Sequence, residues 1–143
     1  MAIKNSASAK WEGSLKEGAG HVSTGSGVLD DTPYSFKKRF EGEKGSNPEE
    51  LVGAAHAACY SMALSMILGE NTPDKIETKA TVTLDEDGEG FSVKKIHLDV
   101  TGHVPGISAE DFADAAEKAK AGCPISKLYE GGTAEITMDA KLA

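Results

Sequence analysis

The sequence contains few cysteines, few aromatic residues and a single arginine. Its 143 residues include 2 cysteines and 6% aromatic residues, and 15 basic side chains stand against 23 acidic ones, for a formal net charge of −8. Two cysteines are too few for a secreted disulfide scaffold. The acidic balance excludes non-specific binding to nucleic acid, which depends on Lys and Arg, and it also argues against binding to anionic membrane surfaces.

An apolar leader and a long uninterrupted apolar run are also missing. Met1 to Ser6 lack the apolar segment of a signal peptide, so we expect a cytoplasmic protein. The longest apolar stretch, Leu51 to Leu68, contains a glycine, a histidine and two serines, which favours a buried core helix over a membrane span. The length fits a single domain over residues 1–143 with a sizeable core.

Short alternating segments dominate the first forty residues. Ala9 to Glu12, Gly20 to Thr24 and Tyr34 to Phe40 alternate apolar and polar side chains, which predicts three strands. The segments between them, including Gly25 to Gly27 and Asp30 to Pro33, are rich in residues typical of turns and predict loops.

The clearest helix in the sequence begins at a proline and runs to Leu68. Asn47 is suited to cap this helix, the proline fits its first position, and Glu49 and Glu50 complement its positive amino end. Gly69 predicts where it ends. Because apolar and small residues lie nearly all round the helix, we expect it to be surrounded by protein.

The remainder of the chain predicts a hairpin, two helices and a last strand. Lys75 to Asp85 and Phe91 to Val104 read as paired strands, and Ala109 to Ala121 as an amphipathic helix. Cys123, followed by a proline, predicts the start of a short helix, and Thr133 to Leu142 alternates as a strand. This order, without βαβ repeats, predicts an α+β fold.

The two cysteines occupy different positions on their predicted helices. Cys59 lies well inside the buried helix, where a lone cysteine is usually a small apolar residue that fills space. Cys123 lies at a helix start, where free backbone N–H groups stabilise a thiolate. From the residues alone, a functional thiol pair and two structural cysteines both stay open.

Arg39 is the only arginine, and its planar guanidinium would stabilise a nearby thiolate if a carboxylate oriented it. A surface arginine on a strand edge is the alternative. Glu49 most simply serves the helix terminus, and about 15 Å of straight helix separate it from Cys59. Glu49 therefore cannot assist the Cys59 of its own chain but could assist that of a partner, which predicts a homodimer.

The four histidines do not form a metal-binding signature, so we expect no metal site. His56 and Cys59 share a helix face, but no second local pair completes a tetrahedral zinc set. The same two residues also raise the hypothesis of a Cys–His acyl hydrolase. Several apolar or polarisable side chains could form either core or a substrate pocket near Cys59: Phe36, Phe40, Tyr60, Met62 and Met66.

Three segments carry a family resemblance. Arg39 to Leu51, Ala54 to Ser65 and Lys118 to Ser126 closely resemble the osmotically inducible protein C (OsmC) family, which is allied to the organic hydroperoxide resistance proteins. The order of strands agrees over essentially the whole chain. The resemblance implies an intertwined α+β homodimer in which antiparallel sheets wrap around a central buried helix.

The resemblance also implies a thiol-dependent peroxidase that reduces organic hydroperoxides in oxidative or osmotic stress defence. Cys59 falls on the family's peroxidatic position and Cys123 on its resolving position. Arg39 falls on the arginine that activates the thiolate in the OsmC branch, and Glu49 on the carboxylate that holds this arginine. Peroxide would oxidise Cys59 to a sulfenic acid, Cys123 would close a disulfide and an external dithiol would reopen it, without metal, haem or flavin.

A function of another class stays open beside the peroxidase. The chain could be a non-catalytic, dimeric binding protein whose groove holds an apolar ligand and whose two cysteines are structural. Titration of free thiols after peroxide treatment separates the two hypotheses, because only the peroxidase should lose them.

Overall fold

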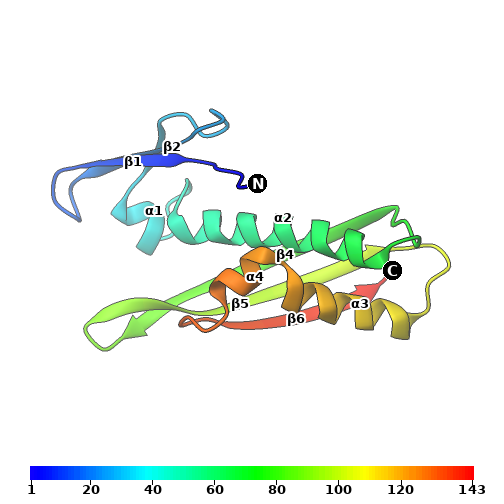
Figure 1. Ribbon diagram of the computed structural model, residues 1–143. Helices are drawn as coiled ribbons and strands as arrows, with labels where there is room; N and C mark the ends of the chain where they lie inside the picture. The colour runs from blue at the N-terminus through cyan, green and yellow to red at the C-terminus, as the bar shows by residue number, and fades with distance from the viewer. The chain divides into compact units, whose positions relative to one another are not determined.

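Six strands form two separate three-stranded sheets in the computed structural model, which describes residues 1–143. The first sheet belongs to a unit of residues Met1–Leu51 and the second to a unit of residues Val52–Ala143. Helices accompany both sheets (Figure 1), so the predicted α+β class is confirmed.

The sheet of the N-terminal unit is antiparallel throughout. Its strands, in spatial order, are β1 (Ala7–Glu12), β2 (Ala19–Thr24) and β3 (Thr32–Tyr34). The rings of Trp11 and Tyr34 lie 5.5 Å apart above Gly20 of the middle strand. A Cβ atom at Gly20 would lie 2.6 Å from both rings, so glycine is what lets the two outer strands share an aromatic contact.

The segment Tyr34 to Phe40, predicted to be a strand, is mostly a helix, so that prediction was wrong. Helix α1 spans Phe36–Phe40, and the Oγ of its N-cap Ser35 accepts a hydrogen bond from the backbone N–H of Lys38 at 3.2 Å. The two phenylalanines at its ends lie on one helix face, with ring centroids 4.9 Å apart. A segment this short fits both periodicities, and the serine cap favours the helix.

Helix α2 spans Pro48–Leu68, with the predicted start and end. The Oδ1 of Asn47 accepts the backbone N–H of Glu50 at 2.8 Å. The chain leaves the helix through Gly69 in the left-handed conformation, with a φ of 59°.

Within the single chain only one face of α2 is buried, so protein on all sides of this helix stays a prediction for the homodimer. The buried residues are Gly53, His56, Tyr60, Ala63, Leu64 and Leu68. Met62 and Met66, on another face, are 76% and 77% exposed. By length and composition alone α2 could cross a membrane, a test that the core helices of soluble proteins also pass. Its packing against a sheet is that of a core helix.

The sheet of the C-terminal unit is mixed. In spatial order its strands are β4 (Lys75–Asp87), β5 (Gly90–His103) and β6 (Glu135–Leu142). The first two form the predicted hairpin, but β6 runs parallel to β5, so the expectation of antiparallel sheets is wrong here. Helices α3 (Ala109–Gly122) and α4 (Pro124–Tyr129) connect these parallel strands, which creates one βαβ crossover.

The core of this unit lies between the sheet and the helices α2 and α3 (Figure 1). Alternate residues of β5 point inward, and Ile96, Leu98 and Val100 are at most 2% exposed. The ring of Phe112, from α3, occupies the space where a Cβ atom of Gly102 would lie, 2.5 Å from the ring. This close approach fixes α3 against the middle strand and thereby places the helix end that precedes Cys123.

Candidate active site

Cys59 and Cys123 meet inside the C-terminal unit although 64 residues separate them in sequence. Their Sγ atoms lie 3.0 Å apart, and both are free thiols. Cys59 projects from α2 and is partly exposed, whereas Cys123 is completely buried. Since a disulfide bond measures about 2.0 Å, a movement of about 1 Å would join the sulfurs.

The position of Cys123 follows from local sequence. Its backbone N–H donates to the carbonyl of Ala119 at 2.9 Å and so closes the end of α3. Cys123 is also the N-cap of α4, with Pro124 in the first turn, and its Sγ accepts the backbone N–H of Ser126 at 3.5 Å. The predicted helix start at this cysteine is confirmed, and its sulfur lies among amide donors.

The two thiols differ in proton affinity. Burial raises the pKa of Cys59, and its hydrogen bond with Cys123 raises it further. Burial acts on Cys123 as well, but its hydrogen bonds with Cys59, Ser126 and Ile125 outweigh it and hold the pKa of Cys123 below its usual value. The surroundings of Cys59 within this unit therefore favour its protonated form, and a nearby positive group would be needed to ionise it.

Arg39 and Glu49 form a bidentate ion pair in the N-terminal unit. Arg39 Nη2 donates to Glu49 Oε1 at 2.7 Å, and Nε lies 3.2 Å from both carboxylate oxygens. The arginine side chain is 37% exposed and the glutamate side chain 14%. Two parallel contacts hold the plane of the guanidinium in one orientation. The other amino group of the guanidinium can then bind an anion.

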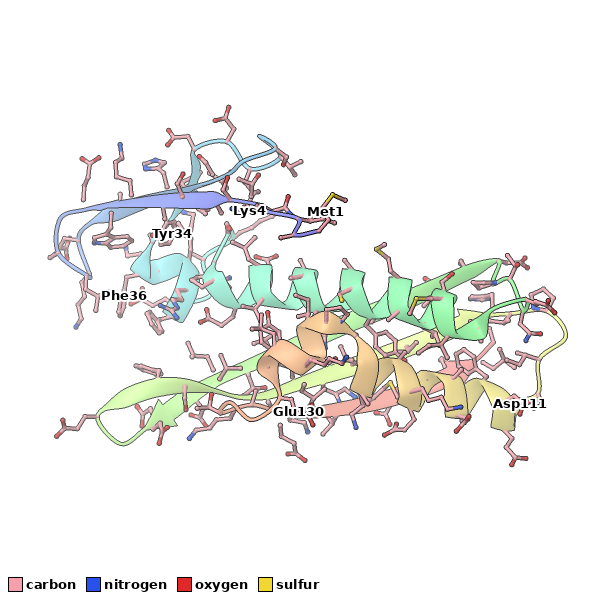
Figure 2. All side chains as sticks on the ribbon, viewed as in Figure 1. Met1, Lys4, Tyr34, Phe36, Asp111 and Glu130 are labelled. Carbon is pink, nitrogen blue, oxygen red and sulfur yellow. The ribbon has the colours of Figure 1, made fainter.

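A hollow of about 200 Å³ lies beside this ion pair and is largely apolar. Its lining residues are Trp11, Leu15, Tyr34, Ser35, Phe36, Arg39 and Phe40. Phe36 and Phe40, two of the predicted substrate-binding residues, are therefore brought together with Arg39, whose guanidinium lies 5.2 Å from the Phe40 ring. Tyr34 and Phe36 are labelled in Figure 2, on β3 and α1. One cation at the edge of an aromatic hollow suits an apolar molecule with one polar end.

The other three predicted substrate-binding residues are not brought together. Tyr60 is completely buried, and its hydroxyl donates to the carbonyl of Ala116 at 3.0 Å, which makes it a core residue. Burial raises the pKa of this phenol. Met62 and Met66 are exposed on a different face of α2 and line no described hollow.

His56 is hydrogen-bonded to Ser126, a residue that the sequence analysis missed. His56 Nε2 lies 2.7 Å from Ser126 Oγ, and both side chains are buried. This contact occupies one ring nitrogen of His56, and the other, Nδ1, is buried without a hydrogen-bond partner. Ser126 is the third residue after Cys123, and a residue at that distance from a helix N-cap normally donates its backbone N–H to the cap. That spacing is the sequence signal that could have identified Ser126.

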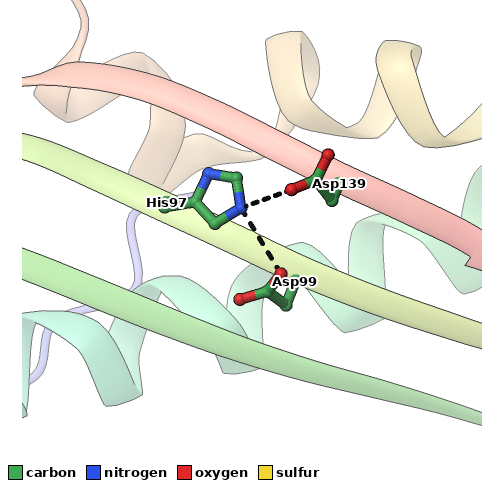
Figure 3. A group of neighbouring side chains, drawn as sticks. All are labelled: His97, Asp99 and Asp139. Atoms are coloured by element: carbon green, nitrogen blue, oxygen red, sulfur yellow. Dashed lines mark hydrogen bonds and ion pairs between the residues drawn. The ribbon is translucent and has the colours of Figure 1, made fainter.

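One cluster of side chains capable of holding a metal lies on the outer face of the C-terminal sheet. His97 Nε2 is 2.9 Å from Asp139 Oδ2 and 3.4 Å from Asp99 Oδ1 (Figure 3). The two aspartates are direct neighbours across β5 and β6. Like charges in that arrangement repel one another, and the imidazole of His97 lies against both, with a hydrogen bond to Asp139.

Comparison with known proteins identifies the class to which the fold and the thiol pair belong. The family described as OsmC-like protein matches residues 41–138. The chain is 55% identical over 144 residues to peroxiredoxin OsmC of Escherichia coli strain K12, with 99% of each chain covered. It is 31% identical over 126 residues to organic hydroperoxide resistance protein OhrB of Bacillus subtilis strain 168, covering 86% of this chain and 90% of the relative.

Solved structures show the same fold. The crystal structure of OhrB from Bacillus subtilis matches with a TM-score of 0.73 at 28% identity, over 95% of this chain and 98% of that one. A structure of an OsmC protein from Legionella pneumophila matches with a TM-score of 0.70 at 22% identity, over 99% of both chains. The chain belongs to the OsmC-like family, and the predicted family relationship is confirmed.

Proposed function

We propose that this chain, a thiol-based peroxidase of the OsmC-like family, reduces organic hydroperoxides to alcohols with Cys59 and Cys123 as its reacting residues. The observation that carries the proposal is the 3.0 Å contact between the two sulfurs. The relatives named peroxiredoxin OsmC and organic hydroperoxide resistance protein support a hydroperoxide as substrate and a role in stress defence.

In the first step the Cys59 thiolate attacks the outer oxygen of the hydroperoxide. The O–O bond breaks as an S–O bond forms, and the alkoxide takes up a proton and leaves as the alcohol. Because burial raises the pKa of Cys59, the thiolate needs a cation, and Arg39, held by Glu49, supplies it. The aromatic hollow beside Arg39 would receive the organic part of the substrate.

In the second step Cys123 attacks the sulfur of the Cys59 sulfenic acid. An S–S bond forms, the S–O bond breaks and hydroxide leaves to become water. Since the sulfurs are already in contact, this step competes well with further oxidation of Cys59. An external dithiol then reduces the disulfide by thiol exchange.

The proposal includes a cytoplasmic homodimer in which residues 1–143 form one OsmC-like domain. The exposed face of α2 carries an apolar stripe at four-residue spacing: Ala54, Ala58, Met62 and Met66. Small and flexible apolar residues in that pattern suit the close approach of a second copy. Glu49 precedes Cys59 by about 15 Å of helix, so Arg39 and Glu49 of one chain would serve the Cys59 of the partner.

The test measures consumption of cumene hydroperoxide, with dithiothreitol as reductant, by the wild type and two single variants. Cys59→Ser is expected to consume no hydroperoxide. Cys123→Ser is expected to complete one turnover and stop as a sulfenic acid that dimedone captures. Repeated turnover by Cys59→Ser would overturn the proposal.

A further inference from the structure

Two side-chain contacts link α2 to the segment that begins α4, and the peroxidase steps above use only one of them (Figure 1). The Sγ atoms of Cys59 and Cys123 lie 3.0 Å apart, and His56 Nε2 lies 2.7 Å from Ser126 Oγ. On each segment the two contacting residues are three positions apart, which is about one helical turn. The earlier residue of one segment meets the later residue of the other, so the contacts are successive rungs between segments that run in opposite directions.

The rung between His56 and Ser126 is a buried hydrogen bond. The two residues are 0% and 2% exposed, and the His56 ring also lies edge-on to the ring of Tyr129, with centroids 5.5 Å apart. Burial lowers the pKa of His56, so the ring is neutral and carries a single N–H. Nδ1 is buried without a partner, and a buried N–H without an acceptor is costlier than an unused lone pair. The proton is therefore favoured on Nε2, which donates to Ser126 Oγ.

Helix α4 is short and has a single buried residue. It contains six residues, well below the roughly 12 that an isolated helix needs in water, so tertiary contacts must hold it in place. Ser126 is its buried residue, whereas Ile125 and Tyr129 are partly buried. Gly131, with a φ of 82°, turns the chain away just after the helix ends. The hydrogen bond from His56 is thus the buried polar contact that ties α4 to α2.

The contact between the thiols is too weak to hold the two segments together while the cysteines are reduced. A thiol is a weak hydrogen-bond donor and a weak acceptor, so the approach of the two sulfurs contributes little by itself. Breaking the bond between His56 and Ser126 would instead leave polar groups unpaired in the core, which is costly. This bond also involves no atom whose redox state changes.

We infer that His56 and Ser126 are positioning residues that hold α2 and α4 in register while the disulfide is open, so that the two thiols stay within bonding reach. This inference rests on the proposed peroxidase cycle, and it holds for either ionisation state of the thiols. A slide of one segment along the other by a single turn, about 5.4 Å, would carry the sulfurs out of reach. The hydrogen bond opposes that slide because the slide would break it as well.

The expected consequence is a disulfide that forms more readily. Closure joins two sulfurs in one S–S bond, so it takes place only in molecules in which the two sulfurs are in contact. Without the hydrogen bond, α4 is free to leave α2 in the reduced chain, and the fraction of molecules in that arrangement falls. In the oxidised chain the S–S bond holds the segments together whether or not the hydrogen bond is present. Loss of the hydrogen bond therefore shifts the equilibrium toward the open dithiol.

The first test measures the equilibrium between the full-length protein and dithiothreitol. The two protein thiols transfer two electrons and two protons to oxidised dithiothreitol, which gives one protein disulfide and one reduced dithiothreitol. Ser126→Ala is expected to lower the equilibrium constant for the protein disulfide about fivefold, because a net hydrogen bond contributes about that factor. An equal constant in this variant and the wild type overturns the inference alone. A wild type that forms no disulfide counts against the peroxidase cycle itself.

Ser61→Ala is the matched control on the same helix. Ser61 Oγ lies 2.7 Å from Thr78 Oγ1, so its hydroxyl ties α2 to β4 instead of α4. Its removal is expected to lower the free energy of unfolding but to leave the equilibrium constant of the thiols unchanged. An equal fall of that constant in Ser61→Ala and Ser126→Ala would show that general loss of stability is responsible, and would overturn the inference.

A double-mutant cycle distinguishes one shared contact from two independent effects. His56→Leu and Ser126→Ala each remove the same hydrogen bond, so the double variant is expected to have nearly the equilibrium constant of either single variant. Single losses that multiply in the double variant, to about twenty-five-fold, would show that the two residues do not act through their contact. That result would overturn the inference.

Hydrogen exchange in the wild type covers the case in which these variants do not fold. The backbone N–H of Lys127 donates to the carbonyl of Cys123 at 3.0 Å, and that of Glu130 to the carbonyl of Ser126 at 2.8 Å. Both N–H groups report whether α4 is formed. Their protection is expected to persist when the disulfide is reduced, because the bond from His56 remains. Loss of protection on reduction would show that the disulfide alone holds α4, and would overturn the inference.

Discussion

Glu49 Oε1 accepts hydrogen bonds from both Nε and Nη2 of Arg39, at 3.2 and 2.7 Å, across ten residues of sequence. The contact joins the short helix α1 to the first turn of α2, and the only arginine in the chain is thereby held in a fixed plane. A guanidinium in this arrangement stabilises an anion with less orientational freedom to lose than a lysine ammonium.

We predict that Arg39→Lys slows the oxidation of Cys59 by hydroperoxide at least about tenfold at neutral pH, because lysine loses the bidentate contact. If Arg39 lowers the pKa of the Cys59 thiol as proposed, its loss should move the midpoint of the pH–rate profile upward, and the rate should recover as pH rises. Stopped-flow oxidation across pH measures this shift. Lys38→Ala is the matched control, since Lys38 pairs with Glu43 instead. An unchanged pH–rate profile in Arg39→Lys would show that Arg39 does not activate the Cys59 thiol.

Treatment with one equivalent of organic hydroperoxide is expected to remove both free thiols and leave one disulfide within each chain. The contact of Cys59 with Cys123 in the same unit is the reason for an intrachain bond. Thiol titration and intact mass under non-reducing conditions measure this result. Two unreacted thiols would instead favour the dimeric binding protein for an apolar ligand.

Met62→Lys is expected to weaken the dimer, because it places a charge in the middle of the exposed apolar stripe of α2. Sedimentation at micromolar concentration should then show monomer where the wild type is dimeric. Val28→Lys is the control, since Val28 is 84% exposed and lies outside that stripe. A wild type that sediments as a monomer would contradict the proposed assembly, and also the assignment of Glu49 to a partner's thiol.

Gly102→Ala is expected to lower the free energy of unfolding by about 1–3 kcal/mol, because the new methyl group would overlap the ring of Phe112. Urea denaturation measures the change. Gly122→Ala provides the contrast, since it has open space around its Cβ position and lies at the end of α3. There alanine should be neutral or stabilise the chain by up to about 1 kcal/mol. Equal changes in the free energy of unfolding at Gly102 and Gly122 would show that the contact with Phe112 does not restrict the side chain at Gly102.

The fold was most predictable where neighbouring residues decide it. Asn47 and Cys123 both cap helices through a backbone N–H three residues later, so the signal for each of these helix starts lies within one turn of sequence. The exception is Tyr34 to Phe40, where the five residues of α1, Phe36–Phe40, were too few to separate the period of a helix from that of a strand.

The resemblance accounts for most of the functional prediction. The thiol-based peroxidase and its family are confirmed by relatives that span the chain. The individual roles of Cys59, Cys123, Arg39 and Glu49 stay predictions, to be decided by the variants above. Tyr60 shows where residue type misleads, because a tyrosine next to Cys59 in sequence lies on the core side of the helix, with its hydroxyl bound to α3.

By itself, the sequence determined the α+β class, the helix ends and the family, since these depend on local spacing and on residue identity. Only the tertiary structure decided that β6 lies parallel to β5 and that His56 meets Ser126 across 70 residues. Such contacts arise when helices pack on a common sheet. Packing is set by the shapes of many distant side chains at once, and no short stretch of sequence contains that information.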